Sequence, residues 1–289
     1  MVKNLCFLVI ISLASTLLGQ KINLYPDQLQ LLETQAAFFN PSSISDDSVA
    51  FNLHFANKVN TRSFGKVALR LVEGGLQSTK NNKVQVIRFQ LANEKEGPYI
   101  SKNRVYFNYT LKLALSPVTY LSAGTSLGLA SAHVDAYSSS LYANYAVPDA
   151  SLGFTLQHKK FTYGFSSSQL FNNSVNAYSD LVRLTRYFNT HLSYRAAINS
   201  HLTICYTSWS RLFIDIPTQW SNSIDFYFAK LISLGGAYHL NRGLSFFLSA
   251  SSRLKHQQVK VFFAYNSGAL TRSSSVYQSL ELSISFFCR

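Results

Sequence analysis

Hydrophobic and polar residues alternate strictly along residues 104–115. One face of this stretch is apolar and carries Val105, Phe107, Tyr109, Leu111, Leu113 and Leu115. The other face is polar and carries Arg104, Asn108, Thr110 and Lys112. Successive side chains of a β-strand point to opposite faces, so the stretch predicts a strand with one apolar and one polar surface. Its length and pattern are typical of a tilted strand that crosses a bilayer, apolar toward lipid and polar toward a lumen.

The same alternation recurs along the chain. Clear examples are residues 49–56, 87–91, 161–166, 202–207, 224–228, 244–249 and 280–286. Weaker examples are residues 64–72, 118–133, 149–157, 184–195, 230–239 and 258–266. Together they predict about fourteen strands, an even number that suits a closed bacterial barrel with both ends in the periplasm. The predicted fold is therefore all-β, an antiparallel transmembrane β-barrel of the outer membrane.

The lengths of the connections give a second signal. From the strand at 104–115 onward, the gaps are alternately short and long, at 116–117, 134–148, 158–160, 170–183, 196–200 and 209–219. Outer-membrane barrels have short periplasmic turns and longer outside loops. Two gaps depart from the rule: 241–243 is tight where a long loop is expected, and 73–82 is long on the periplasmic side.

The beginning of the chain has the pattern of a secretory signal peptide. Lys3 precedes an apolar run over residues 5–18, and a cut after Gly19 is plausible. A cut after Ala14 and an uncleaved anchor helix are the alternatives. No later apolar run reaches the roughly 18 residues of a transmembrane helix. We expect a signal peptide over 1–19, an N-terminal periplasmic or plug segment over 20–47, and the barrel over 48–289.

The segment 20–47 precedes the first clear strand. A helix is expected around residues 28–38, ending before Asn40 and Pro41. Three roles are compatible with its sequence. It could plug the lumen, dock a periplasmic partner or lead into the barrel.

Composition supports a β-rich membrane protein. Only 13% of the residues are charged, and the chain has 22 Phe and 17 Tyr, an aromatic excess that interfacial girdles of a barrel would use. The formal net charge is +13. The export signal and the scattering of single Arg and Lys residues argue against nucleic acid as a partner. The basic charge is expected to line the lumen or to meet acidic lipid headgroups and acidic proteins.

Catalytic and metal-binding patterns are weak. His133 and Asp135 share a strand face, but no nucleophile or third ligand is placed beside them by spacing, so we interpret them as a loop-edge pair. A barrel enzyme therefore has little support from these patterns. Gly124 and Gly128 fall in an alternating stretch and so do not form a helix-packing motif. No cofactor or metal is predicted.

The two cysteines left after processing are expected to stay unpaired. Cys205 and Cys288 continue opposite strand faces, which disfavours a disulfide between them.

Three blocks resemble the PorP/SprF outer-membrane proteins of the type IX secretion and gliding system of Bacteroidetes. They are Ala-Phe-Phe-Asn-Pro-Ser-Ser-Ile at 37–44, Asn-Glu-Lys-Glu-Gly-Pro at 93–98, and Val-Pro-Asp-Ala-Ser-Leu-Gly-Phe at 147–154 with the strand and loop at 160–166 and 170–172. Two departures are present. Residues 45–48 replace the family's Asn-Pro-Ala-Tyr-Ala-Gly stretch, and the chain ends Phe-Cys-Arg rather than on an aromatic residue.

The resemblance implies a non-enzymatic protein of the cell outer membrane that supports export or surface attachment of cargo with C-terminal sorting domains. Its implied partners are outer-membrane lipid, other type IX secretion components and the cargo. Positions that match the family motifs, and are candidates for binding, are Phe39, Asn40, Pro41, Gly97, Pro98, Pro148 and Asp149. Such residues also form ordinary turns. A passive porin or solute transporter is the alternative function.

Overall fold

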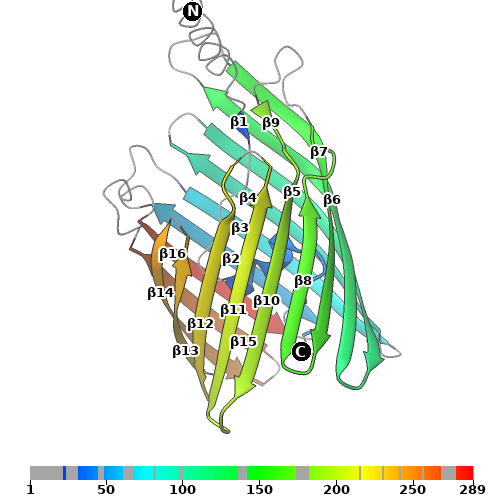
Figure 1. Cartoon of the computed structure of the whole chain (residues 1–289), viewed down its shortest axis with the longest axis vertical. Helices are drawn as coiled ribbons and strands as arrows, with labels where there is room; N and C mark the ends of the chain where they lie inside the picture. Colours follow the sequence, from blue (N-terminus) through cyan, green and yellow to red (C-terminus); the bar gives the residue numbers. More distant parts are fainter. Residues whose placement is uncertain are drawn as a thin grey trace, which may run out of the picture.

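A computed structural model describes residues 22–23, 32–44, 49–60, 68–80, 83–97, 100–135, 142–173, 182–214, 216–229, 231–240, 242–255, 257–267 and 278–288. Within these residues, fourteen strands close into one barrel, and each pairs antiparallel with its two neighbours (Figure 1). The predicted fold class and strand number are confirmed. The predicted signal peptide lies outside the described residues.

Seven strands form the first half of the wall. These are β2 (Phe51–Asn60), β3 (Ala68–Lys80), β4 (Lys83–Glu96), β5 (Ile100–Ser116), β6 (Thr119–Asp135), β7 (Tyr142–His158) and β8 (Phe161–Ser168). The second half consists of β10 (Tyr187–Ala197), β11 (Leu202–Phe213), β12 (Gln219–Phe228), β13 (Ile232–His239), β14 (Gly243–Leu254), β15 (Gln257–Asn266) and β16 (Ser279–Cys288). Every stretch predicted from alternation overlaps one of these strands.

The barrel closes where the last strand pairs with the first. Ile284 of β16 lies opposite Phe55 of β2 in an antiparallel ladder. The tight β5–β6 and β7–β8 hairpins lie at the same end of the barrel as the end of β16 (Figure 1). The expectation of a long periplasmic gap at 73–82 is wrong, because β3 continues to Lys80, which pairs with Lys83 of β4.

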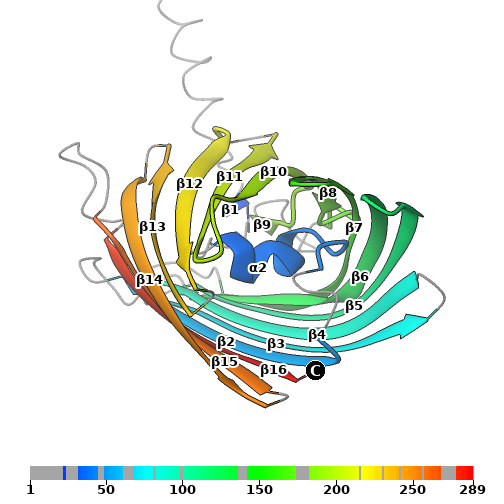
Figure 2. The same cartoon turned by 90° about the horizontal axis from the view of Figure 1, so that it is seen from below.

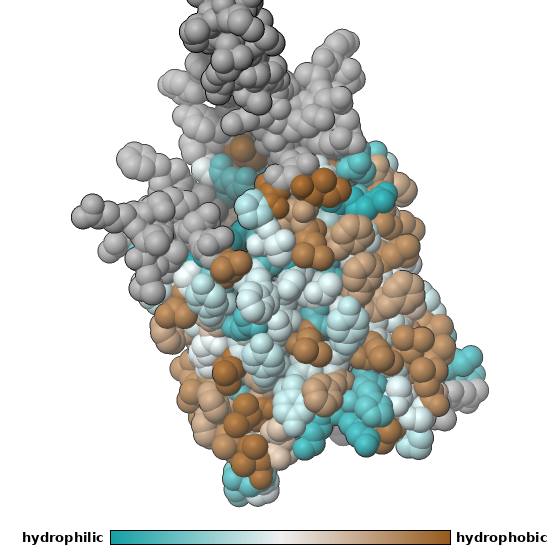
Figure 3. All heavy atoms as spheres, in the orientation of Figure 1, coloured by the Kyte–Doolittle hydropathy of each residue, from teal (hydrophilic) through white to brown (hydrophobic). Residues whose placement is uncertain are grey.

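Side chains of the wall point alternately into the lumen and outward. On β5, Arg104 is 3% exposed and Thr110 is fully buried, whereas Phe107 is 62% exposed. Hydrophobic side chains cover much of the outer face (Figure 3). This arrangement places apolar groups toward lipid and polar groups inside, as expected for a barrel of the outer membrane.

A short helix lies inside the barrel. Helix α2 (Leu32–Phe39) is enclosed by the wall when the barrel is seen along its axis (Figure 2). It overlaps the helix predicted around residues 28–38 and ends one residue later. Further toward the N-terminus, β1 (Ile22–Asn23) pairs in parallel with β9 (Val182–Arg183). No helix among the described residues is long and apolar enough to cross a membrane.

Cys205 and Cys288 are not joined by a disulfide, as predicted. Cys205 is buried on the inner face of β11, and Cys288 is partly exposed at the end of β16.

Candidate functional site

The end of helix α2 is bound by the barrel wall. The carbonyl oxygen of Phe39 accepts hydrogen bonds from Ser166 Oγ at 2.6 Å and Asn189 Nδ2 at 3.1 Å. The Phe39 ring packs edge-on against Trp209, with 6.0 Å between ring centroids, and the Arg211 guanidinium lies 4.5 Å from the Phe39 centroid. Side chains from three strands, β8, β10 and β11, therefore all contact Phe39.

The next residue, Asn40, ends the helix and links it to β7. Its backbone N–H donates to the carbonyl of Ala36 at 2.8 Å. Its Nδ2 donates to Thr155 Oγ1 at 3.2 Å, and its Oδ1 accepts from the Ser42 backbone N–H at 3.1 Å and from Ser42 Oγ at 2.7 Å. Ser42 Oγ also lies 2.7 Å from Thr155 Oγ1. Asn40 and Ser42 are buried, so these polar groups are satisfied within the lumen, as buried groups require.

Glycines in the wall make room for this turn. Gly124 of β6 and Gly153 of β7 are cross-strand partners. A Cβ at Gly124 would lie 2.5 Å from the carbonyl carbon of Pro41, and one at Gly153 would lie 2.0 Å from Asn40 Oδ1. A Cβ at Gly164 of β8 would lie 2.7 Å from Asn40 Nδ2. The three glycines form a hollow in which the backbone of the turn approaches the sheet directly.

Arg88 of β4 binds the other side of the turn. Its Nη2 donates to the Ser43 carbonyl at 2.6 Å, and its Nη1 donates to Asn108 Oδ1 and Thr110 Oγ1, each at 3.2 Å. Thr110 Oγ1 donates in turn to the Pro41 carbonyl. We call residues 39–43, with the wall side chains that bind them, the luminal anchor. It joins the N-terminal segment to strands β4 to β8, β10 and β11.

The charge of Arg88 is compensated within the wall. Glu73 Oε1 of β3 lies 3.9 Å from Arg88 Nε, and Glu73 Oε2 accepts from Gln90 Nε2 at 2.7 Å. All three side chains are buried. Burying charges is costly unless they are paired and hydrogen-bonded, and this pair meets both conditions.

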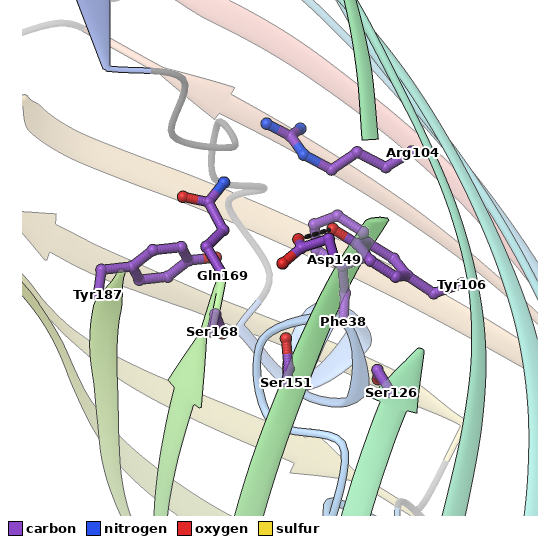
Figure 4. Close-up of a pocket in the computed structure, with 9 residues that line it drawn as sticks. All are labelled: Phe38, Arg104, Tyr106, Ser126, Asp149, Ser151, Ser168, Gln169 and Tyr187. Carbon is purple, nitrogen blue, oxygen red and sulfur yellow. Dashed lines mark hydrogen bonds between the residues drawn. The ribbon is translucent and has the colours of Figure 1, made fainter. Parts of the chain in front are cut away.

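A small polar pocket lies beside α2. Tyr106 donates its hydroxyl to Asp149 Oδ2 at 2.6 Å, and the Ala150 backbone N–H donates to Asp149 Oδ1 at 2.7 Å. The Phe38 ring lies 6.3 Å from the Tyr106 ring. The pocket is lined by Phe38, Arg104, Tyr106, Ser126, Asp149, Ser151, Ser168, Gln169 and Tyr187 (Figure 4).

Ion pairs extend from this pocket along the β4–β5 hairpin. Arg104 Nη1 donates to Glu94 Oε2 at 2.9 Å, and Lys102 Nζ lies 3.8 Å from Glu94 Oε1. Lys102 also pairs with Glu96. Several basic residues that the sequence suggested for the lumen are thus neutralised by acidic neighbours.

The structure places the seven candidate binding residues in different surroundings. Phe39, Asn40 and Pro41 belong to the luminal anchor, and Asp149 belongs to the neighbouring pocket. The structure thus brings these four residues to the same part of the lumen.

The remaining three candidates are not part of this group. Pro148 faces outward, and its carbonyl accepts from Asn173 Nδ2 at 2.7 Å. Gly97 occupies a turn with φ of 71°, a conformation that glycine adopts readily. Pro98 lies outside the described residues.

Sequence reasoning missed the wall residues that complete the anchor. Arg88 and Thr155 looked like ordinary polar positions of alternating strands, and Gly124 was assigned no role. The one available signal is that Gly124, Gly153 and Gly164 all occur within a run of three consecutive predicted strands.

The described residues contain no group of three or more His, Cys, Asp or Glu that could hold a metal ion. What the site does chemically is to bind backbone carbonyls and a side-chain amide of a peptide segment through hydroxyl, amide and guanidinium donors.

Comparison with known proteins gives a family and a fold. A family model described as "Type IX secretion system membrane protein PorP/SprF" matches residues 43–286. No curated protein matches the chain.

Solved outer-membrane barrels share the fold. A Pseudomonas aeruginosa FadL homologue is 11% identical with a TM-score of 0.56, and the match covers 88% of this chain and 93% of that one. The TodX monoaromatic hydrocarbon channel, as a deltaS2 mutant, is 7% identical with a TM-score of 0.61, covering 88% and 94%. The P. putida toluene transporter TodX is 6% identical with a TM-score of 0.55, again covering 88% and 94%.

Proposed function

Because this chain belongs to the PorP/SprF family of type IX secretion system membrane proteins, we propose that it supports export or surface attachment of cargo proteins with C-terminal sorting domains. It acts through contacts with other secretion components and with cargo, without catalysing a reaction. The observation that carries the proposal is the extent of the family match, which runs from residue 43 to residue 286 and spans the barrel.

The occupied lumen supports a contact role over a passive pore. We propose that the segment 20–47 plugs the barrel. Its helix α2 lies inside the wall, and the carbonyls of Phe39, Pro41 and Ser43 are all bound by wall side chains. A solute pathway would have to pass this segment or displace it.

A secretion assay tests the main proposal. Cells that lack this chain are expected to keep cargo with C-terminal sorting domains inside the cell, and re-expression of the chain should return that cargo to the surface or the medium. Affinity purification of the tagged barrel from native membranes should recover other secretion components. Normal cargo export in the deletion strain would overturn the proposal.

The transport alternative has a different readout. Purified full-length barrel in planar bilayers is expected to show little steady conductance if the segment plugs the lumen. A stable, ion-selective conductance, together with normal cargo export in cells without the chain, would favour a porin.

A further inference from the structure

Described residues on the two sides of helix α2 lie at opposite ends of the barrel, with Ile22 and Asn23 at one end and Ala50 at the other (Figure 1). We propose that the N-terminal segment runs through the lumen, so that the N-terminus of the mature chain lies on the outer face of the cell, while β2 starts at the periplasmic end. Three parts of the chain carry the inference: the β1–β9 pair, the luminal anchor and the start of β2.

The first part is at the end with the longer connections. β1 pairs in parallel with β9, with Ile22 opposite Val182 and Asn23 opposite Arg183. β9 belongs to the connection between β8 and β10, which is held by hydrogen bonds from residues before and after β9. Leu170 N–H donates to the Ala150 carbonyl at 3.0 Å, and Arg186 Nη2 donates to the Leu170 carbonyl at 2.6 Å. Figure 1 shows β1 and β9 at the opposite end from the C-terminus.

The middle part is the luminal anchor. Residues 39–43 lie inside the wall, against Gly153 on one side and Arg88 on the other. These contacts are buried, and they involve strands on both sides of the helix. The chain therefore passes through the lumen at this level.

The third part is at the end with the tight turns. Ala50, just before β2, donates its backbone N–H to the Cys288 carbonyl at 2.8 Å, and its own carbonyl accepts from Gln77 N–H at 2.8 Å. The end of β16 and the tight hairpins mark this end as periplasmic, by the rule that outer-membrane barrels have short periplasmic turns. Residues 22 and 50 thus lie at opposite ends of the barrel.

In this arrangement, the first residues of the mature chain form a short peptide on the outer face of the cell. Both predicted signal cuts leave only a few residues before Ile22, so the new α-amino group would lie beside the outer loops. This end is then accessible to an exported protein on the cell surface and inaccessible to periplasmic partners. The proposed path of the segment is independent of the proposed function, because it does not depend on which cargo the barrel exports.

Single cysteines test the crossing in whole cells. The starting chain carries Cys288→Ser and keeps Cys205, which is 0% exposed. Asn23→Cys reports on β1. Thr218→Cys, in the exposed β11–β12 connection, is the outer control, and Lys159→Cys, in the exposed β7–β8 turn, is the periplasmic control. Cells are treated with a membrane-impermeant maleimide before and after permeabilisation.

We expect Asn23→Cys and Thr218→Cys to react in intact cells and Lys159→Cys to react only after permeabilisation. A second measurement places a protease cleavage site between residues 21 and 22, which external protease should cut in intact cells. Two results would overturn the proposal. One is that Asn23→Cys, like Lys159→Cys, reacts only after permeabilisation. The other is that the N-terminal segment is neither labelled nor cleaved in intact cells.

Discussion

Asn40 donates its side-chain amide to the Thr155 hydroxyl across 3.2 Å, a contact between residues 115 positions apart in the chain. It fixes the end of helix α2 to the inner face of β7. The Oδ1 atom of Asn40 also accepts hydrogen bonds from the backbone N–H and the hydroxyl of Ser42. A single side chain thus organises the turn and attaches it to the wall.

Replacing Asn40 by alanine is expected to loosen the N-terminal segment without opening the barrel. The change leaves the buried backbone N–H of Ser42 without its acceptor, at a cost of about 1–3 kcal/mol. Limited proteolysis should cut the N-terminal segment faster, while the barrel keeps its heat-modifiable migration on gels. Asn103→Ala, on the exposed outer face of β5, is the control and should change neither. Equal proteolysis of the two variants would contradict the prediction.

Gly153→Ala should displace the turn from the wall. The new Cβ would lie 2.0 Å from Asn40 Oδ1, and overpacking of this kind typically costs about 1–3 kcal/mol. We expect higher conductance in planar bilayers than for the unchanged barrel. Gly236→Ala adds the same methyl group 3.5 Å from its nearest contact, the Ser245 carbonyl oxygen, and should leave conductance unchanged. A closed Gly153→Ala barrel would argue against the plug.

Arg88 and Glu73 should be energetically coupled. Arg88→Met removes the partner of a buried carboxylate and four hydrogen bonds to the turn and its neighbours, so we expect a loss of about 3–5 kcal/mol in unfolding free energy. Glu73→Gln in the same background should recover part of the loss, because the uncompensated charge is gone. Urea unfolding of the two single variants and the double variant measures the coupling. Strictly additive effects would show that the pair does not interact.

A charge on the outer face of β5 should disrupt the barrel in a position-dependent way. Phe107 is 62% exposed and lies near the middle of the strand. Phe107→Arg is expected to cost about 2–4 kcal/mol, the value for a basic residue at the bilayer midplane. Asn103→Arg lies nearer the strand end and should cost much less. Folding into lipid vesicles, followed against urea, gives both values, and equal costs would mean that Phe107 does not face lipid.

The strands were predictable because lipid and lumen impose opposite polarity on neighbouring residues. The Phe107 and Thr110 positions of β5 follow that rule directly. The rule failed at Gly74 and Gly75, which have no side chains to continue the alternation, although β3 runs through them. Gly75 allows Asn52 to approach, since a Cβ there would lie 2.3 Å from Asn52 Oδ1.

The luminal anchor was only half predictable. The family motif identified Phe39, Asn40 and Pro41, but nothing local to Arg88 or Thr155 shows that they bind this motif. Their partners are set by how the barrel curves, which brings β4 and β7 to opposite sides of one turn. Alternation describes each strand separately and carries no information about contacts across the lumen.

The luminal anchor also constrains the order of folding. The Phe39 carbonyl can bind Asn189 only after the chain has been made through β10, and β2 can complete its ladders only when β16 arrives. Contacts so distant in sequence form late and slowly, because long loops must close first. Residues 39–43 therefore have no complete binding site until most of the protein exists. Until then, Phe39 and strand β2 both lack their final partners, so the interior and the closing seam of the barrel are completed at the same late stage.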